Sequence, residues 1–346
     1  MLTRLKVALT LDLDQVDLRR GVVGLAGIVA TIVFVAIFGT VGMTAGLAVL
    51  FVVVADSPGP RRDRLVGVLV ITLVGALVAA IATWAGTDHV WVATLLTVGI
   101  TAIATLAAGF GHAWAMRGIL LSLWAVVALS VAGEGESALE LAAAYVLGGL
   151  VAAAILWLQS RMSHEPAEQA TSSGPAARTL GEIARSPLGV FALLRAVAVG
   201  LATVLGIELF PEYPIWPALT VVLVLRPKVG ATLEIGVLRT LGTLGGTMAA
   251  AGIVALAGGS DAAVIVAFLV AALAMMALKD VNYAVFVFFL SAVLVLIQDL
   301  LGKDADLAAE QRLLATLLGA GIAFAALWIV LRLVPQGRGA PRGSEG

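Results

Sequence analysis

Long apolar runs separated by short polar gaps fill most of the chain. A helix that crosses a hydrocarbon core about 30 Å thick needs roughly 20 residues, or fewer where flanking side chains reach the interface. The runs do not alternate between apolar and polar positions, so transmembrane strands are a poor alternative. We predict an all-α transmembrane helical bundle of about twelve spans, at residues 22–40, 42–55, 65–85, 90–109, 118–131, 138–158, 188–210, 213–225, 235–257, 262–278, 281–297 and 313–333.

The basic residues in the gaps predict the orientation, because Lys and Arg favour the cytoplasmic side of a membrane. With the N-terminus inside, almost all of them fall in inside segments, and the outside gaps hold essentially only Lys303. Both termini are therefore expected in the cytoplasm. The chain then divides into a juxtamembrane helix (1–20), a first six-span repeat (21–159), a cytoplasmic linker (160–187), a second six-span repeat (188–334) and a cytoplasmic tail (335–346).

The two halves resemble each other. The string LRRGVVGLA at residues 18–26 recurs as LRAVAVGLA at residues 194–202, and each copy falls at the first span of a half. Later landmarks recur in the same order, namely Pro58 with Gly67, Pro227 with Gly236, and then Gly148 and Gly319. Six spans separate the copies, so the halves have the same orientation and are related by an axis along the membrane normal.

Composition supports a membrane protein and excludes a water-soluble one. Hydrophobic residues make up 61% of the 346 and charged residues 12%, and the mean hydropathy is +1.08. There is no cysteine. The net charge is −1, and almost every charged residue lies in the gaps between the apolar runs. The charges therefore indicate topology, and we expect no nucleic-acid partner.

Several kinds of chemistry find no support in the sequence. No Gly-rich loop ends in Lys-Ser or Lys-Thr, so ATP-driven pumping by this chain alone is not expected. The three histidines, His89, His112 and His164, lie in different gaps and form no metal or catalytic set. We expect no metal, no cofactor and no enzymatic activity.

Residues 213–246 carry a specific pattern: an aromatic pair before Leu-Thr, a proline after a short span, and then an Arg-x-x-Gly-Thr-x-x-Gly helix. This pattern resembles the membrane module of the fusaric acid resistance family, which includes aromatic acid exporters. A later Arg, Thr and Gly match the closing helix of that module. The matching residues are Tyr213, Trp216, Leu219, Thr220, Pro227, Arg239, Gly242, Thr243, Gly246, Arg312, Thr316 and Gly319.

The resemblance implies a multi-pass protein of the cell inner membrane that exports small organic acids, typically aromatic carboxylates. We expect a secondary transporter with proton coupling. The alternatives are a passive organic-anion channel and a non-transporting membrane scaffold or accessory subunit. The expected partners are a small organic anion, membrane lipid and, as one further state, copies of the same chain in a homo-oligomer.

The candidate substrate site lies around the short span of the second half, since interrupted spans often carry transporter sites. Aromatic rings could stack on a substrate, and cations and hydroxyls could bind a carboxylate. Two structural roles compete: Tyr213 and Trp216 could belong to the interfacial aromatic belt, and Arg239, about one turn inside its span, could reach the cytoplasmic surface. The candidate residues are Arg239, Thr220, Trp216, Tyr213, Thr243, Arg226 and Arg312.

Three further assignments follow from position. Arg226 and Lys228 are expected to join Arg239 in a cationic vestibule. Arg195 aligns with Arg19 and is expected to be a charge at the cytoplasmic boundary. A set of glycines is expected to let helix backbones approach closely, namely Gly242, Gly245, Gly246, Gly319 and Gly321.

Overall fold

The computed structural model describes residues 12–55, 61–85, 89–131, 137–162, 179–227 and 229–333, and every regular element in these ranges is helical. The expected all-α class is confirmed. In order, the elements are η1 (Leu13–Gln15), α2 (Leu18–Ala55), α3 (Arg61–Ala85), α4 (Val90–Ala107), η2 (Ala108–Phe110), α5 (His112–Val131), α6 (Ala138–Met162), α7 (Leu180–Ala184), α8 (Pro187–Leu209), α9 (Trp216–Val224), α10 (Val229–Ala257), α11 (Asp261–Ala277), α12 (Tyr283–Leu300) and α13 (Ala305–Leu333).

α2 consists of two apolar arms joined at Gly39, whose φ of 59° and ψ of −137° are not helical. Glycine adopts a positive φ readily because it has no Cβ. Beyond the bend the second arm packs back on the first, with Gly42 against the backbone of Phe34 and Gly46 against the side chain of Thr31. The two arms correspond to the first two predicted spans.

Eight helices of the described residues are long and apolar enough to cross a membrane: α3, α4, α5, α6, α8, α10, α12 and α13. Two apolar helices are shorter, the second arm of α2 at Val41–Ala55 and α11 at Asp261–Ala277. Length and composition thus support a multi-pass membrane protein, and the total of twelve spans stays a prediction.

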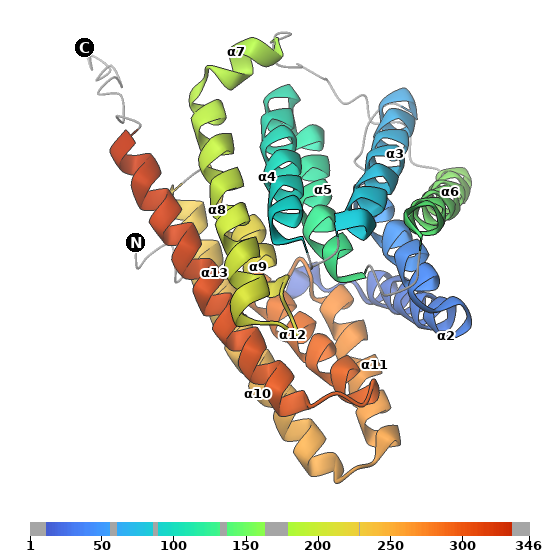
Figure 1. Cartoon of the computed structure of the whole chain (residues 1–346). Helices are drawn as coiled ribbons and strands as arrows, with labels where there is room; N and C mark the ends of the chain where they lie inside the picture. The colour runs from blue at the N-terminus through green and yellow to red at the C-terminus, as the bar shows by residue number, and fades with distance from the viewer. Residues whose placement is uncertain are drawn as a thin grey trace, which may run out of the picture.

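α9 is much shorter than a membrane span. Its nine residues, at a rise of 1.5 Å each, reach only about 13 Å, less than half of a hydrocarbon core of about 30 Å. It packs against α8 and α13 and also contacts α5 and α10, and Figure 1 shows it enclosed by longer helices. Irregular backbone at membrane depth is tolerated where protein surrounds it, as at both ends of α9.

The helices of the two halves pack in matching pairs. α8 lies along α4, and α2 lies along α11. With the two arms of α2 counted as two spans, the first span of each half thus contacts the fourth span of the other. Within the halves, α6 packs on α2 and α3, and α13 packs on α9 and α10. The glycine contacts also match: Gly148 lies against the Ala45 carbonyl, and Gly319 lies against the Pro217 carbonyl.

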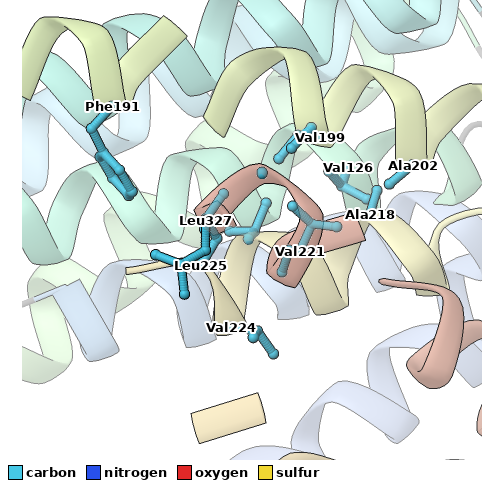
Figure 2. Packing of buried hydrophobic residues seen from close by; sticks show 13 residues of the cluster. Val126, Phe191, Val199, Ala202, Ala218, Val221, Val224, Leu225 and Leu327 are labelled. Atoms are coloured by element: carbon cyan, nitrogen blue, oxygen red, sulfur yellow. The ribbon is translucent and has the colours of Figure 1, made fainter. Parts of the chain in front are cut away.

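One apolar cluster gathers around α9 and ties it to both halves (Figure 2). Where apolar side chains leave water, their burial is the main favourable contribution to the stability of such a cluster. Where lipid surrounds the helices, close packing stabilises the cluster through dispersion contacts. Its members come from α5, α8, the α9 segment and α13, and include Val126, Phe191, Val199, Ala202, Ala218, Val221, Val224, Leu225 and Leu327. α9 is therefore fixed from several sides.

The segments outside the predicted spans are only partly described. Residues 1–11 of the expected juxtamembrane helix lie outside the described residues, and η1 is the only regular element at residues 12–17. In the linker, α7 begins with a capping box, in which Thr179 and Glu182 bond to each other's backbone N–H groups. Residues 163–178, which include His164, and 334–346 also lie outside the described part, as do Pro58 and Lys228.

Candidate functional site

Arg239 lies deep inside α10. The helix begins at Val229, so Arg239 is ten residues along it, or about 15 Å at 1.5 Å per residue. The side chain is only 1% exposed, and its Nε donates a hydrogen bond to Thr220 Oγ1 at 3.4 Å. α10 starts six residues before the predicted boundary of this span, so Arg239 lies further along its helix than the one turn expected. A buried guanidinium held by α9 is not snorkelling to the surface.

Arg312 occupies a similar environment on α13. It is also 1% exposed, and its Cζ lies 5.0 Å from the centroid of the Trp216 ring. A guanidinium over an indole face is a favourable cation–π contact, and it is strongest where water is excluded. Arg312 thus contacts α9 through Trp216, as Arg239 does through Thr220.

The two guanidiniums, which we call the arginine pair, lie close together. Trp216 and Thr220 are four residues apart on α9 and so share one face of that helix. Each of these two residues contacts one of the guanidiniums, so both guanidiniums lie against the same face of α9. The pair concentrates two positive charges at one buried place between α9, α10 and α13.

The arginine pair lacks partners for several of its N–H groups. Nη1 of Arg239 and both Nε and Nη1 of Arg312 are buried and have no hydrogen-bond partner among the described residues. The buried polar side chains of the described chain include no Asp or Glu. Buried charges without a counter-charge are costly. The arrangement is therefore suited to bind an anion.

Aromatic rings extend the site on one side. The ring of Tyr213 stacks on Trp216 with centroids 4.1 Å apart and an angle of 7° between the planes. Lys303, in the turn before α13, has its Nζ over the Tyr213 ring, 5.5 Å from the ring centroid. Both aromatic residues are buried. An interfacial belt would place them toward lipid and water, so the packed role is the one observed.

Thr243 and Arg226 lie further from the pair. Thr243 is one helical turn beyond Arg239 on α10, and Ser291 of α12 donates to its hydroxyl at 3.5 Å. Arg226 lies in the turn between α9 and α10, where its backbone N–H and carbonyl both bond to the Thr232 hydroxyl at 2.9 Å. Burial lowers the pKa of Arg226, and Tyr283 opposes that shift. No described contact joins Arg226 to the arginine pair.

Arg195 is not the boundary charge that its alignment with Arg19 indicated. It is 5% exposed, and its Nη2 donates to the Val222 carbonyl of α9 at 2.7 Å. Its Nη1 donates to Thr105 Oγ1 of α4 at 3.4 Å. The sequence holds a signal for this contact, because Thr94, Thr97, Thr101 and Thr105 recur at helical spacing along α4.

In the first half, α3, α5 and α6 enclose aromatic residues. The Trp124 ring lies 4.6 Å from that of Tyr145 and 5.7 Å from that of Phe51. Trp124 Nε1 donates to the Gly75 carbonyl at 2.8 Å.

Glycines of α10 allow α12 to pack closely against it. A Cβ on Gly242 would overlap the Ala284 carbonyl, and one on Gly246 would overlap the Phe288 carbonyl. Gly245 also approaches Phe288, whereas Gly321 has no atom within 4 Å of its Cβ position. The expected packing role is confirmed for these α10 glycines and for Gly319, and it is wrong for Gly321.

The region that contains the arginine pair matches a known family. Residues 196–326 match the family model described as fusaric acid resistance protein-like. These residues, fewer than half of the chain, are similar to a fusaric acid resistance protein-like domain. The domain runs from α8 into α13 and includes both arginines, so the resemblance inferred from their motifs is confirmed. No curated protein and no solved structure matches the chain.

The described residues contain no group of three or more His, Cys, Asp or Glu side chains placed to hold a metal ion. The side chains that meet at the site are guanidiniums, a hydroxyl and aromatic rings.

Proposed function

We propose that the chain is a secondary transporter that exports small organic acids, with the arginine pair as its substrate-binding centre. The observation that carries the proposal is the burial of two guanidiniums with unpartnered N–H groups and no buried carboxylate among the described residues. Transport in general is supported by the helices long enough to cross a membrane and by the match to the fusaric acid resistance protein-like family. The arginine pair supports an anion as the cargo.

A carboxylate matches the unpartnered groups. Guanidinium N–H groups bind carboxylate oxygens as paired, charge-assisted hydrogen bonds. A carboxylate between Arg239 and Arg312 would accept from Nη1 of Arg239 and from one of the two unpartnered N–H groups of Arg312. It would also offset the repulsion between the two cations. Thr220, whose hydroxyl already accepts from Arg239, would fix the orientation of one guanidinium.

The aromatic stack supports an aromatic acid. Tyr213 and Trp216 present flat, apolar surface next to Arg312, and a substrate ring would gain stacking energy there. Such a ring would have to displace part of the stack, because Trp216 covers Arg312. Proton coupling is part of the proposal, since the sequence lacks a nucleotide-binding loop.

We also propose the finer architecture: about twelve crossings of the cell inner membrane, one of them made by α9 together with the irregular segments at its ends, in two parallel six-span repeats with both termini in the cytoplasm. The matched packing of α8 on α4 and of α2 on α11 supports the repeat. So do the parallel contacts of Gly148 and Gly319.

Flux into liposomes tests the proposed function. Purified protein is reconstituted, and uptake of benzenesulfonate and labelled benzoate is measured with and without an imposed pH gradient. Benzenesulfonate stays ionised and so does not leak as a neutral acid. Accumulation driven by the gradient is expected. Flux that only dissipates a concentration gradient would indicate a channel, and no flux of either anion would indicate a scaffold.

A further inference from the structure

Arg195 connects the two halves of the protein at α9. Its side chain extends from α8 and is almost fully buried. One end of the guanidinium donates to the Val222 carbonyl at 2.7 Å, and another N–H donates to Thr105 Oγ1 at 3.4 Å. Thr105 belongs to α4, in the first half of the chain, and Val222 belongs to α9, in the second.

The bond to Val222 stabilises the end of a short helix. The last four carbonyls of a helix have no partner within it, and Val222 lies in the final turn of α9. A cationic side chain at this end also interacts favourably with the helix dipole. Because α9 has only nine residues, a shift of its last turn moves Trp216 and Thr220 as well.

The bond to Thr105 holds the guanidinium from the other side. The Thr105 hydroxyl donates to the Thr101 carbonyl at 2.7 Å, so its oxygen is left to accept from Arg195. Side chain and backbone thus form a continuous chain of hydrogen bonds from α4 through Arg195 to α9. α4 and α8 pack along each other over much of their length, which keeps the two ends of this chain in register.

We propose that Arg195 and Thr105 are positioning residues, through which α4 of the first half fixes α9 and thereby the geometry of the arginine pair. This inference rests on the proposed anion transport. Neither residue contacts Trp216, Thr220, Arg239 or Arg312 in any described bond. They act through the last turn of α9, and their loss alters the affinity for the anion.

The matched pair Thr105→Val and Thr94→Val tests the proposal. Both are threonines on α4 that donate to a carbonyl of their own helix, and only Thr105 also accepts from Arg195. Thr105→Val is expected to raise the KM for benzoate roughly fivefold, the order of one lost hydrogen bond, while Vmax stays close to that of Thr94→Val. Arg195→Lys keeps the charge and should raise KM further, since an ammonium cannot span both acceptors. Equal KM values for wild type, Thr105→Val and Arg195→Lys would overturn the proposal.

A second measurement does not depend on transport. Ala218 of α9 is fully buried, and the chain has no native cysteine, so Ala218→Cys provides a single buried thiol. The rate at which N-ethylmaleimide modifies this thiol reports how often α9 moves away from its neighbouring helices. Combining it with Arg195→Gln or Thr105→Val should speed modification several-fold, and Thr94→Val should not. Faster modification in a protein that moves no anion would sink the transport proposal and leave the positioning role standing. Unchanged modification in all variants would overturn the positioning role.

Discussion

Trp216 and Thr220 lie one turn apart on α9, and each contacts one of two buried guanidiniums from different helices. A nine-residue helix therefore sets the spacing between Arg312 of α13 and Arg239 of α10. Charges on long helices would otherwise move apart under their mutual repulsion. The short helix, rather than either long one, determines whether a single carboxylate can reach both cations.

Arg239→Lys should lose most benzoate transport while the protein reaches the membrane at a normal level. Lysine keeps the charge but lacks the planar fork that binds both a carboxylate and Thr220. Arg239→Ala should lose transport entirely. The measurement is initial flux in liposomes at matched protein content. Flux near that of the wild type in a correctly inserted Arg239→Lys protein would exclude Arg239 as the carboxylate anchor.

Arg312→Met should make the protein more stable and inactive. Methionine has a similar length, and replacing buried charges by apolar side chains often stabilises a protein by about 1–4 kcal/mol. The expected result is a higher Tm in detergent together with loss of flux. A lower Tm would contradict the view that Arg312 is held in place for binding, because it would mean that its contact with Trp216 stabilises the fold.

Gly246→Ala should destabilise the protein by about 1–3 kcal/mol, the usual cost of overpacking. The new methyl group would overlap the Phe288 carbonyl, which is backbone and cannot rotate away. Gly252→Ala on the same helix is the control, since its Cβ would meet no atom within 4 Å. The comparison is made by thermal unfolding in detergent. Equal Tm values for the two variants would show that α10 and α12 do not pack as closely as described.

Single cysteines should report the orientation of the second half. Arg185, before α8, and Ser260, between α10 and α11, are both exposed, and the chain has no cysteine of its own. In intact cells an impermeant thiol reagent should label Ser260→Cys and leave Arg185→Cys unlabelled until the membrane is opened. The reverse pattern would overturn the proposed cytoplasmic location of the linker.

Much of the fold could be predicted because the lengths of the apolar runs, and the glycines and prolines that interrupt them, indicate where helices begin and end. The division of α2 at Gly39 was expected from the break between two runs. The start of α10 was placed too late, since the Thr232 hydroxyl bonds to the Arg226 backbone and lets the helix begin soon after Pro227. Capping of this kind depends on contacts that a hydropathy pattern does not contain.

The site was partly predictable. The motif residues Arg239, Arg312, Thr220, Trp216 and Tyr213 do come together, because the motif marks the helices that meet at α9. The role of Arg195 was not predictable from its alignment with Arg19. Burial of an arginine depends on which helix faces it, and here that helix is α4, about ninety residues earlier in the chain.

The length of α9 also has a consequence for biogenesis. A nine-residue apolar helix is far shorter than the roughly 20 residues that a membrane-inserted segment needs. We therefore expect that α9 is not inserted into the bilayer as a separate segment. α9 must instead take its position when α8, α10 and α13 assemble around it. During synthesis the arginine pair therefore comes together only after α13 has left the ribosome, and chains truncated before α13 should be inserted but should lack the proposed anion site.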